Sequence, residues 1–287
     1  MLAQAAWGLP GVVVDAGGEL HVDDPALAAA EDAGPGADIF AAEPFRGLDA
    51  FLDLVADREG PVKVQVTGPV TLGLALDAAG ADAERAFTVA GEAVRNRCRA
   101  LLDLAEARIP ASPLVMFLDE PGLTGCMHPG FPISPERAVD LVSTALAVIE
   151  PRAITGVHCC GAADWQLVLQ TGPQILSAPI DAGLHRSAGA IAAFLDDGGW
   201  IAWGAVPTDG PVGTTGDRLW RQLSDLWCEL VRGGCEPVRL RTQALITPAC
   251  GLALHGESQA AHVLELTRKV AQRVHDQAIG VRLSVGA

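Results

Sequence analysis

Short apolar runs alternate along the chain with longer stretches in which apolar residues recur every three or four positions. The first pattern predicts β-strands and the second predicts amphipathic helices. The predicted strands cover residues 11–15, 37–43, 62–67, 114–120, 153–160, 174–180, 200–206 and 244–250. The predicted helices cover residues 25–32, 45–57, 82–108, 134–149, 162–169, 187–196, 217–232 and 257–278.

This alternation of strands and helices over 287 residues matches the (β/α)8 barrel, for which about 250 residues are typical. A doubly wound open sheet is the alternative α/β architecture. No predicted strand, however, is followed by the G-x-G-x-x-G loop of that fold. We therefore predict a single-domain (β/α)8 TIM barrel over residues 1–287. Its first strand has the weakest apolar signal, so an incomplete first βα unit is an alternative.

Charge and hydropathy exclude several classes of protein. The 20 Lys and Arg against 35 Asp and Glu give a formal net charge of −15, which argues against a nucleic-acid partner. No apolar run reaches the ~18 residues of a membrane span, and the N-terminus lacks the basic segment of a secretory signal. We expect a cytoplasmic protein without a membrane partner. Its seven scattered cysteines are then thiols or metal ligands rather than disulfides.

Catalytic groups of a barrel lie at the carboxyl ends of its strands. The side chains there that can carry chemistry are Asp15, Glu43, Thr67, Asp119, Glu120, His158, Cys160, Asp181, Thr208, Asp209 and Cys250.

The segment His158-Cys159-Cys160 closes the predicted fifth strand. Side chains alternate across a strand, so His158 and Cys160 face one side and Cys159 the other. This is half of a zinc site, and Cys250 at the end of the eighth strand can add a second thiolate. Buried cysteines and a hydrogen-bonded core histidine are the alternative, and spacing alone does not decide between the two.

Asp119 and Glu120 end the fourth strand and also face opposite sides. One can hold a substrate ammonium while the other pairs with surrounding elements; two acids that only cap the loop are the alternative. After Thr67, Gly68 allows the backbone to approach a ligand and Pro69 opens a helix.

Four motifs in order, GPVT at 68–71, LDEP at 118–121, HCC at 158–160 and TPACGL at 247–252, resemble the catalytic domain of cobalamin-independent methionine synthase, in its short core form. The wider resemblance is to the uroporphyrinogen decarboxylase-like superfamily, which includes corrinoid-protein methyltransferases. It extends from about residue 37 to the end of the chain.

The resemblance implies a barrel in which zinc activates a substrate thiol. His158, Cys160 and Cys250 then fall on the zinc-ligand positions. Asp119, and Glu43 of AEPFRG, fall on the acids that bind the ammonium of homocysteine, and Thr67 is placed with the substrate-binding residues. Zinc coordination would deprotonate the thiol at neutral pH, which makes it a nucleophile for a methyl group.

Three departures from the family concern the fourth zinc ligand, the binding of the substrate carboxylate and the methyl donor. The family's glutamate ligand after the sixth strand has only Asp181 as a nearby stand-in, and the first-strand segment that contacts the homocysteine carboxylate has no counterpart. The folate-binding N-terminal domain of long members is absent. A methylated corrinoid or corrinoid protein is therefore favoured over folate as the donor.

We thus expect a zinc-dependent thiol methyltransferase of methionine biosynthesis. The alternatives are a corrinoid-protein or coenzyme-thiol methyltransferase of the wider superfamily and a non-catalytic metal- or thiol-binding paralogue. Decarboxylation of a tetrapyrrole acid is disfavoured, because it needs several arginines where these strand ends carry acids.

Overall fold

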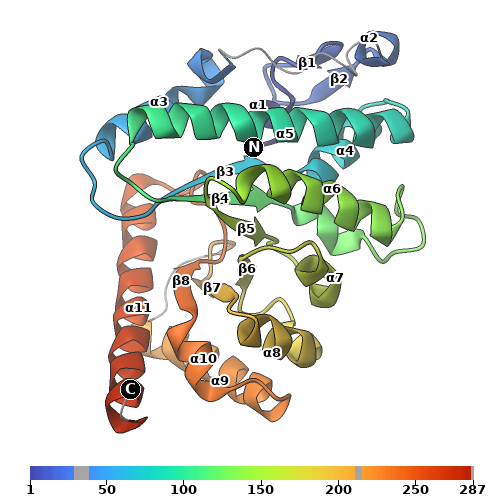
Figure 1. The fold of residues 1–287 in the computed structure, drawn as a ribbon. Helices are drawn as coiled ribbons and strands as arrows, with labels where there is room; N and C mark the ends of the chain where they lie inside the picture. The colour runs from blue at the N-terminus through green and yellow to red at the C-terminus, as the bar shows by residue number, and fades with distance from the viewer. Residues whose placement is uncertain (29–38, 211–214, 286–287) are drawn as a thin grey trace. The chain divides into compact units, whose positions relative to one another are not determined.

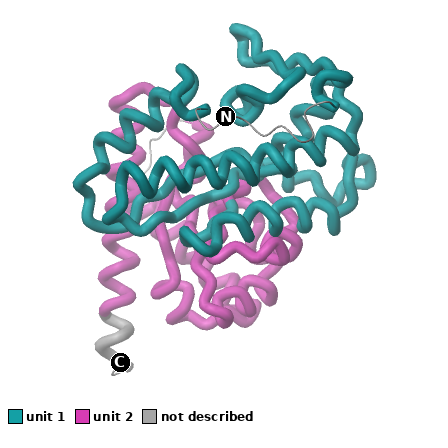
Figure 2. The backbone as a smooth tube through the Cα atoms, turned by 45° about the horizontal axis from the view of Figure 1, so that its top comes forward, with its two compact units in different colours: residues 1–157 teal, residues 158–287 magenta. Residues whose placement is uncertain are grey.

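The computed structural model describes residues 1–28, 39–210 and 215–285, with side chains described up to residue 279. The chain forms two compact units, Met1–Val157 and His158–Ala287 (Figure 2). The prediction of a single domain stays a prediction. No helix among the described residues is both long enough and apolar enough to cross a membrane.

Six strands form one sheet in the order of the sequence (Figure 1). They are β3 (Val62–Thr67), β4 (Leu114–Asp119), β5 (Ile154–His158), β6 (Ile175–Pro179), β7 (Trp200–Val206) and β8 (Ala244–Pro248). The neighbours β3 and β4, β6 and β7, and β7 and β8 are parallel. This is the αβ alternation expected from the sequence, and it is TIM-like. It is not the predicted closed eight-stranded barrel, because β3 and β8 are the edges of the sheet within the described part of the chain.

The first two predicted strands account for the difference. Residues of the first form β1 (Val12–Val14), which pairs antiparallel with β2 (Leu20–Val22) in a separate hairpin. The Asp15 carboxylate accepts hydrogen bonds from the backbone of Gly17 and Glu19 and so closes the hairpin turn.

The predicted strand at 37–43 is also wrong where the structure describes it. Its first two residues lie outside the described residues, as do the last four of the helix predicted at 25–32, which otherwise corresponds to α2 (Asp24–Ala28). The rest forms two 3₁₀ helices, η1 (Ile39–Ala41) and η2 (Glu43–Phe45). Pro44 has no amide hydrogen for a strand ladder and suits the first turn of a helix.

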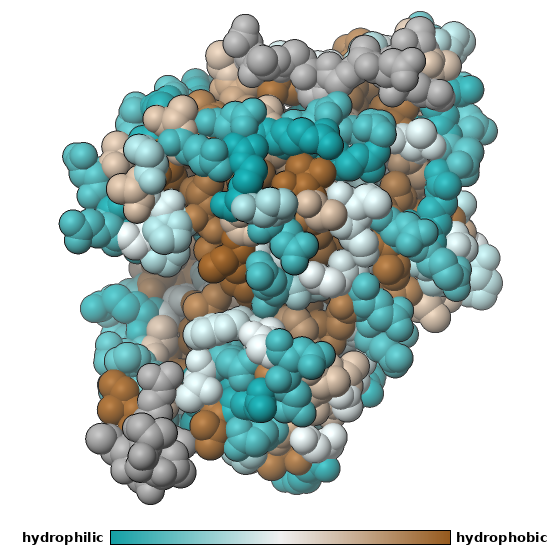
Figure 3. Space-filling view, in the orientation of Figure 1, coloured by the Kyte–Doolittle hydropathy of each residue, from teal (hydrophilic) through white to brown (hydrophobic). Residues whose placement is uncertain are grey.

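The first unit is built on β3 and β4. Its helices are α1 (Leu2–Ala6), α2, α3 (Arg46–Leu54), α4 (Pro69–Ala78), α5 (Ala83–Arg108) and α6 (Pro135–Ile149), with the 3₁₀ helix η3 (Pro121–Gly125) after β4. The side chains of Asp82 and Ser134 cap α5 and α6 at their N-termini. α5 packs against α4 and α6, and hydrophilic side chains cover much of its outward face (Figure 3).

The apolar period did not predict α4, although Pro69 marked a helix start. Six of its ten residues are buried, so it lacks the polar face that marks an amphipathic helix.

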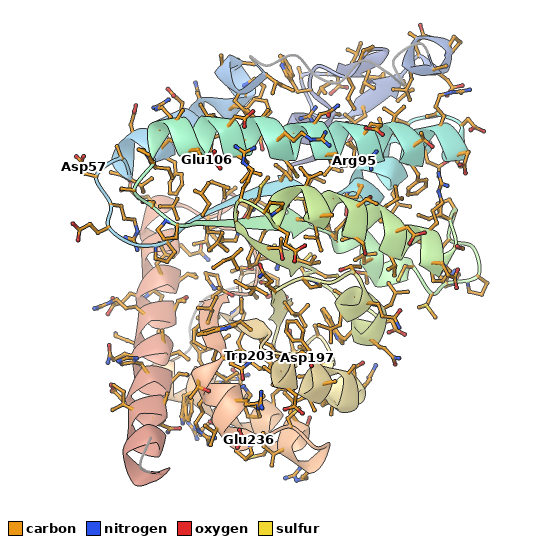
Figure 4. The ribbon with its side chains drawn as sticks, viewed as in Figure 1. Asp57, Arg95, Glu106, Asp197, Trp203 and Glu236 are labelled. Carbon is orange, nitrogen blue, oxygen red and sulfur yellow. The ribbon has the colours of Figure 1, made fainter. Side chains whose placement is uncertain are left out.

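The second unit is built on β6, β7 and β8. Its helices are α7 (Trp165–Gln170), η4 (Leu184–Ser187), α8 (Ala188–Asp196), α9 (Gly216–Arg232), α10 (Pro237–Thr242) and α11 (Glu257–Val285). Trp203 on β7 is fully buried (Figure 4) and lies edge to face with Trp227 of α9, their ring centroids 6.0 Å apart. These two tryptophans belong to the core that fixes β7.

Candidate metal centre

The structure brings His158, Cys160 and Cys250 together, all within the second unit. One ligand atom from each lies within 4.8 Å of the others. His158 ends β5, and Cys250 follows β8 by two residues. Cys159 is fully buried while Cys160 is exposed, which is the alternation expected of a strand end.

A glycine on the neighbouring strand allows the chain to reach Cys250. A Cβ at Gly204 would lie 2.8 Å from Cα of Ala249 and 3.0 Å from Cα of Pro179. Ala249 continues the ladder beyond β8 by donating its backbone N–H to the carbonyl of Val206 at 2.8 Å. The position of Cys250 therefore depends on this close approach of backbones.

His158 is oriented by a buried hydroxyl. Its Nδ1 lies 3.0 Å from Oγ of Ser177 on β6, and Ser177 is only 6% exposed. Metal-ligating histidines commonly have a hydrogen-bond partner at one ring nitrogen and the metal at the other. Sequence reasoning missed Ser177; its place on the predicted strand that follows the one ending at His158 was the available signal.

The donor set fits zinc. One imidazole nitrogen and two sulfurs are typical zinc ligands, and bonds of about 2.1–2.3 Å would separate tetrahedral ligands by roughly 3.5–3.8 Å. Burial, and then the neighbouring Cys250, raise the pKa of the Cys160 thiol. Two adjacent thiols resist ionisation unless a cation is bound between them, and a divalent metal would reverse this preference. Three protein ligands leave a position for a substrate atom.

A cavity of about 530 Å³ opens onto the two cysteines. Its walls include carboxylates from the loops after β6 and β7 and from α9, namely Asp181, Asp209, Asp225 and Glu229, and also Thr208. Asp181 thus lines the cavity but does not belong to the three-residue group of ligand atoms. Its role as a fourth ligand stays a prediction.

Asp119 lies in the first unit and is 5% exposed. It is paired with Thr67 in the β3–β4 register, and its carboxylate accepts a hydrogen bond from Nε2 of Gln65 at 2.7 Å. Burial raises the pKa of Asp119 to about 6, an effect that the positive charge of Lys63 partly offsets. Gln65 is a second partner that sequence reasoning missed; it lies two residues before Thr67, on the same face of β3.

Glu120 is fully buried and holds the start of α4. Its carboxylate accepts hydrogen bonds from the backbone of Val70 at 2.9 Å and of Thr71 at 2.8 Å, and from the Thr71 hydroxyl at 2.6 Å. A Cβ at Gly68 would lie 2.3 Å from this carboxylate. Gly68 therefore makes room for Glu120, rather than for the ligand that the sequence suggested.

Glu43 is exposed on η2, and its carboxylate lies 3.4 Å from the guanidinium of Arg46. Asp119 lines a cavity of about 140 Å³ in the first unit, and Glu43 is not among the residues that line it. Its role in binding an ammonium stays a prediction.

Comparison with known proteins supports the fold. No protein-family model and no curated protein matches the sequence. Among solved structures, this chain is similar to a B12-independent methionine synthase from Shewanella sp. W3-18-1 in complex with selenomethionine. The TM-score is 0.53 at 14% sequence identity, and the match covers 77% of this chain and 64% of that chain. The chain thus shares the fold of part of a methionine synthase.

Proposed function

We propose that this protein is a zinc-dependent thiol methyltransferase, similar to methionine synthase and acting in methionine biosynthesis. The observation that carries the proposal is the group formed by His158, Cys160 and Cys250 at the wall of a cavity of about 530 Å³. Such a cavity admits a small substrate, and a three-ligand site leaves a coordination position for its thiol.

Each residue of the centre has a defined task. Cys160 and Cys250 would hold the metal as thiolates, and Ser177 would keep Nε2 of His158 turned toward it. When bound, zinc would supply the positive charge that keeps a substrate thiol deprotonated at neutral pH. The thiolate sulfur then attacks the methyl carbon of the donor, and a sulfur–carbon bond forms as the bond between the donor and its methyl group breaks.

The finer assignments belong to the same proposal. The thiol is homocysteine or a related aminothiol, whose ammonium Asp119 and Glu43 would bind. The donor is a methylated corrinoid or corrinoid protein. Asp181 is the candidate for the fourth ligand. The buried carboxylate of Asp119 supports its role, since an ion pair formed away from water is strengthened.

Metal analysis of the protein purified under reducing conditions tests the centre. We expect one zinc per chain in the wild type and its loss in Cys250→Ser and His158→Ala. Cys228→Ser is the matched control, because Cys228 is an exposed cysteine of α9, and it should keep the metal. A wild-type protein without zinc would contradict the proposal.

A methyl-transfer assay tests the reaction. The zinc-loaded protein should convert homocysteine to methionine with methylcobalamin as the donor, and Cys250→Ser should be inactive. Zinc binding without methyl transfer from corrinoid or folate donors would instead support the alternative of a metal-binding paralogue.

A further inference from the structure

The first unit has a second, smaller cavity of about 140 Å³. Its polar walls come from separate elements: Gln65 and Thr67 of β3, Asp119 at the end of β4, Arg97 of α5 and Gln4 of α1. The cavity therefore has a cationic side chain and an acidic one among its walls.

Arg97 is a buried cation without an acidic partner among the described residues. It is 3% exposed, and burial lowers its pKa to about 10. Its two terminal nitrogens donate to the backbone carbonyls of Gln4 and Trp7, each at 2.6 Å. Its Nε donates to no atom of the described residues. Neutral carbonyls do not cancel the charge, and an uncompensated buried charge is costly.

Asp119 does not compensate Arg97, although both line the cavity. Its described hydrogen bond is with Gln65, and its described charged neighbours are Lys63 and the N-terminal ammonium of Met1. Arg97 retains donors for an anion, since a guanidinium offers five N–H groups in a planar fork. In a ligand that carries both groups, the carboxylate would pair with Arg97 and the ammonium would pair with Asp119.

We propose that Arg97 is a carboxylate-binding residue and that this cavity binds the carboxylate of a small α-amino acid. Arg97 would contact the carboxylate and thereby determine specificity for amino acids over simple amines. That this amino acid is the methyl acceptor rests on the proposed function; binding in the cavity does not.

Binding of three probes without a thiol, measured by calorimetry on the full chain, tests this inference apart from the metal. L-2-aminobutyrate carries both charged groups, butyrate only the carboxylate and propylamine only the ammonium. A charge-assisted hydrogen bond contributes about 1.5–3 kcal/mol, or roughly 10–100-fold in affinity. The wild type should therefore bind L-2-aminobutyrate at least ~10-fold more tightly than propylamine.

Arg97→Gln should weaken binding of L-2-aminobutyrate and butyrate by at least ~10-fold and leave propylamine unchanged. Arg99→Gln is the matched control, since Arg99 is an exposed arginine on the same helix, and it should bind all three probes as the wild type does. Equal losses for all three probes in Arg97→Gln would mean that Arg97 only anchors Gln4 and Trp7, and would overturn the inference.

The wild-type measurement keeps the inference falsifiable even if Arg97→Gln does not fold. Wild-type protein that binds neither carboxylate probe, or that does not prefer L-2-aminobutyrate to propylamine, overturns it. Carboxylate selectivity in a protein without zinc would contradict the proposed function alone, while zinc and methyl transfer without selectivity would contradict this inference alone.

Discussion

At the residue scale, single polar contacts set the chemistry of each site. The hydroxyl of Ser177 illustrates this, because it lies 3.0 Å from Nδ1 of His158 and fixes the orientation of the imidazole. The same holds for Asp119, because its burial raises the pKa of its carboxyl group.

Ser177→Ala should lower zinc affinity by about 10–100-fold, the usual cost of losing an outer-shell partner of a metal ligand. Competition with a chromogenic zinc chelator measures the change. Ser258→Ala, at an exposed position of α11, should retain wild-type affinity. Unchanged affinity in Ser177→Ala would show that this hydroxyl does not position His158.

Asp119→Asn should change how stability depends on pH. Burial raises the pKa of Asp119 from 3.8 to about 6, so the folded chain binds this proton more tightly than the unfolded chain. Its contribution to the free energy of unfolding is then full below pH 3.8 and is lost as the pH rises to about 6. Asparagine keeps an acceptor for Gln65 but cannot ionise.

Urea denaturation at pH 4 and pH 6 measures the effect. The wild type should lose more stability over this interval than Asp119→Asn, by about 2 kcal/mol. Asp140→Asn, which changes an exposed acid on α6 of the same unit, should behave as the wild type does. The same loss in Asp119→Asn and the wild type would contradict a raised pKa at this position.

At the element scale, the junction of β4 and α4 depends on one buried carboxylate. Glu120 accepts from two backbone N–H groups at the start of α4, groups that have no partner within the helix. Gly68 has no Cβ, and this leaves space for the Glu120 carboxylate.

Gly68→Ala should destabilise the protein by about 1–3 kcal/mol, because its Cβ would overlap a buried side chain that has no room to move. The denaturation midpoint measures this. Gly189→Ala is the matched control: Gly189 lies within α8 and a Cβ there meets no atom within 4 Å. That variant should be stabilised by about 0.4–1 kcal/mol. Equal effects of the two substitutions would contradict the packing of Glu120 against Gly68.

At the scale of the whole molecule, metal binding and folding should be coupled. The three proposed ligands come from the ends of β5 and β8, which are separated by about a third of the chain. The unfolded chain cannot hold them together, so zinc would bind the folded state preferentially.

Zinc should therefore raise the temperature of unfolding. Free zinc at 1,000 times its dissociation constant would stabilise the protein by about 4 kcal/mol, which corresponds to several degrees in Tm. Thermal unfolding with zinc and with excess chelator measures the difference. Cys250→Ser should show no such difference. A wild-type Tm that is the same with zinc and with chelator would contradict the coupling.

Local pattern predicted several elements together with their bounds. The strands expected at 62–67 and 200–206 are confirmed without any shift as β3 and β7. The helix expected at 82–108 is confirmed as α5 (Ala83–Arg108), whose apolar residues recur with the helical period. The predicted strand at 11–15 was wrong as part of a barrel, since an apolar run does not specify the strand with which it pairs.

The sequence by itself determined the strand-and-helix alternation from β3 to α11 and the side of each strand end on which His158, Cys160 and Asp119 lie. Both follow from periods of two and 3.6 residues, which are local properties of the backbone. Only the tertiary structure decided that Cys250 lies beside Cys160, that Ser177 orients His158, and that the positive charge of Arg97 lines a cavity. These depend on contacts between residues far apart in the chain, and no local pattern encodes such contacts.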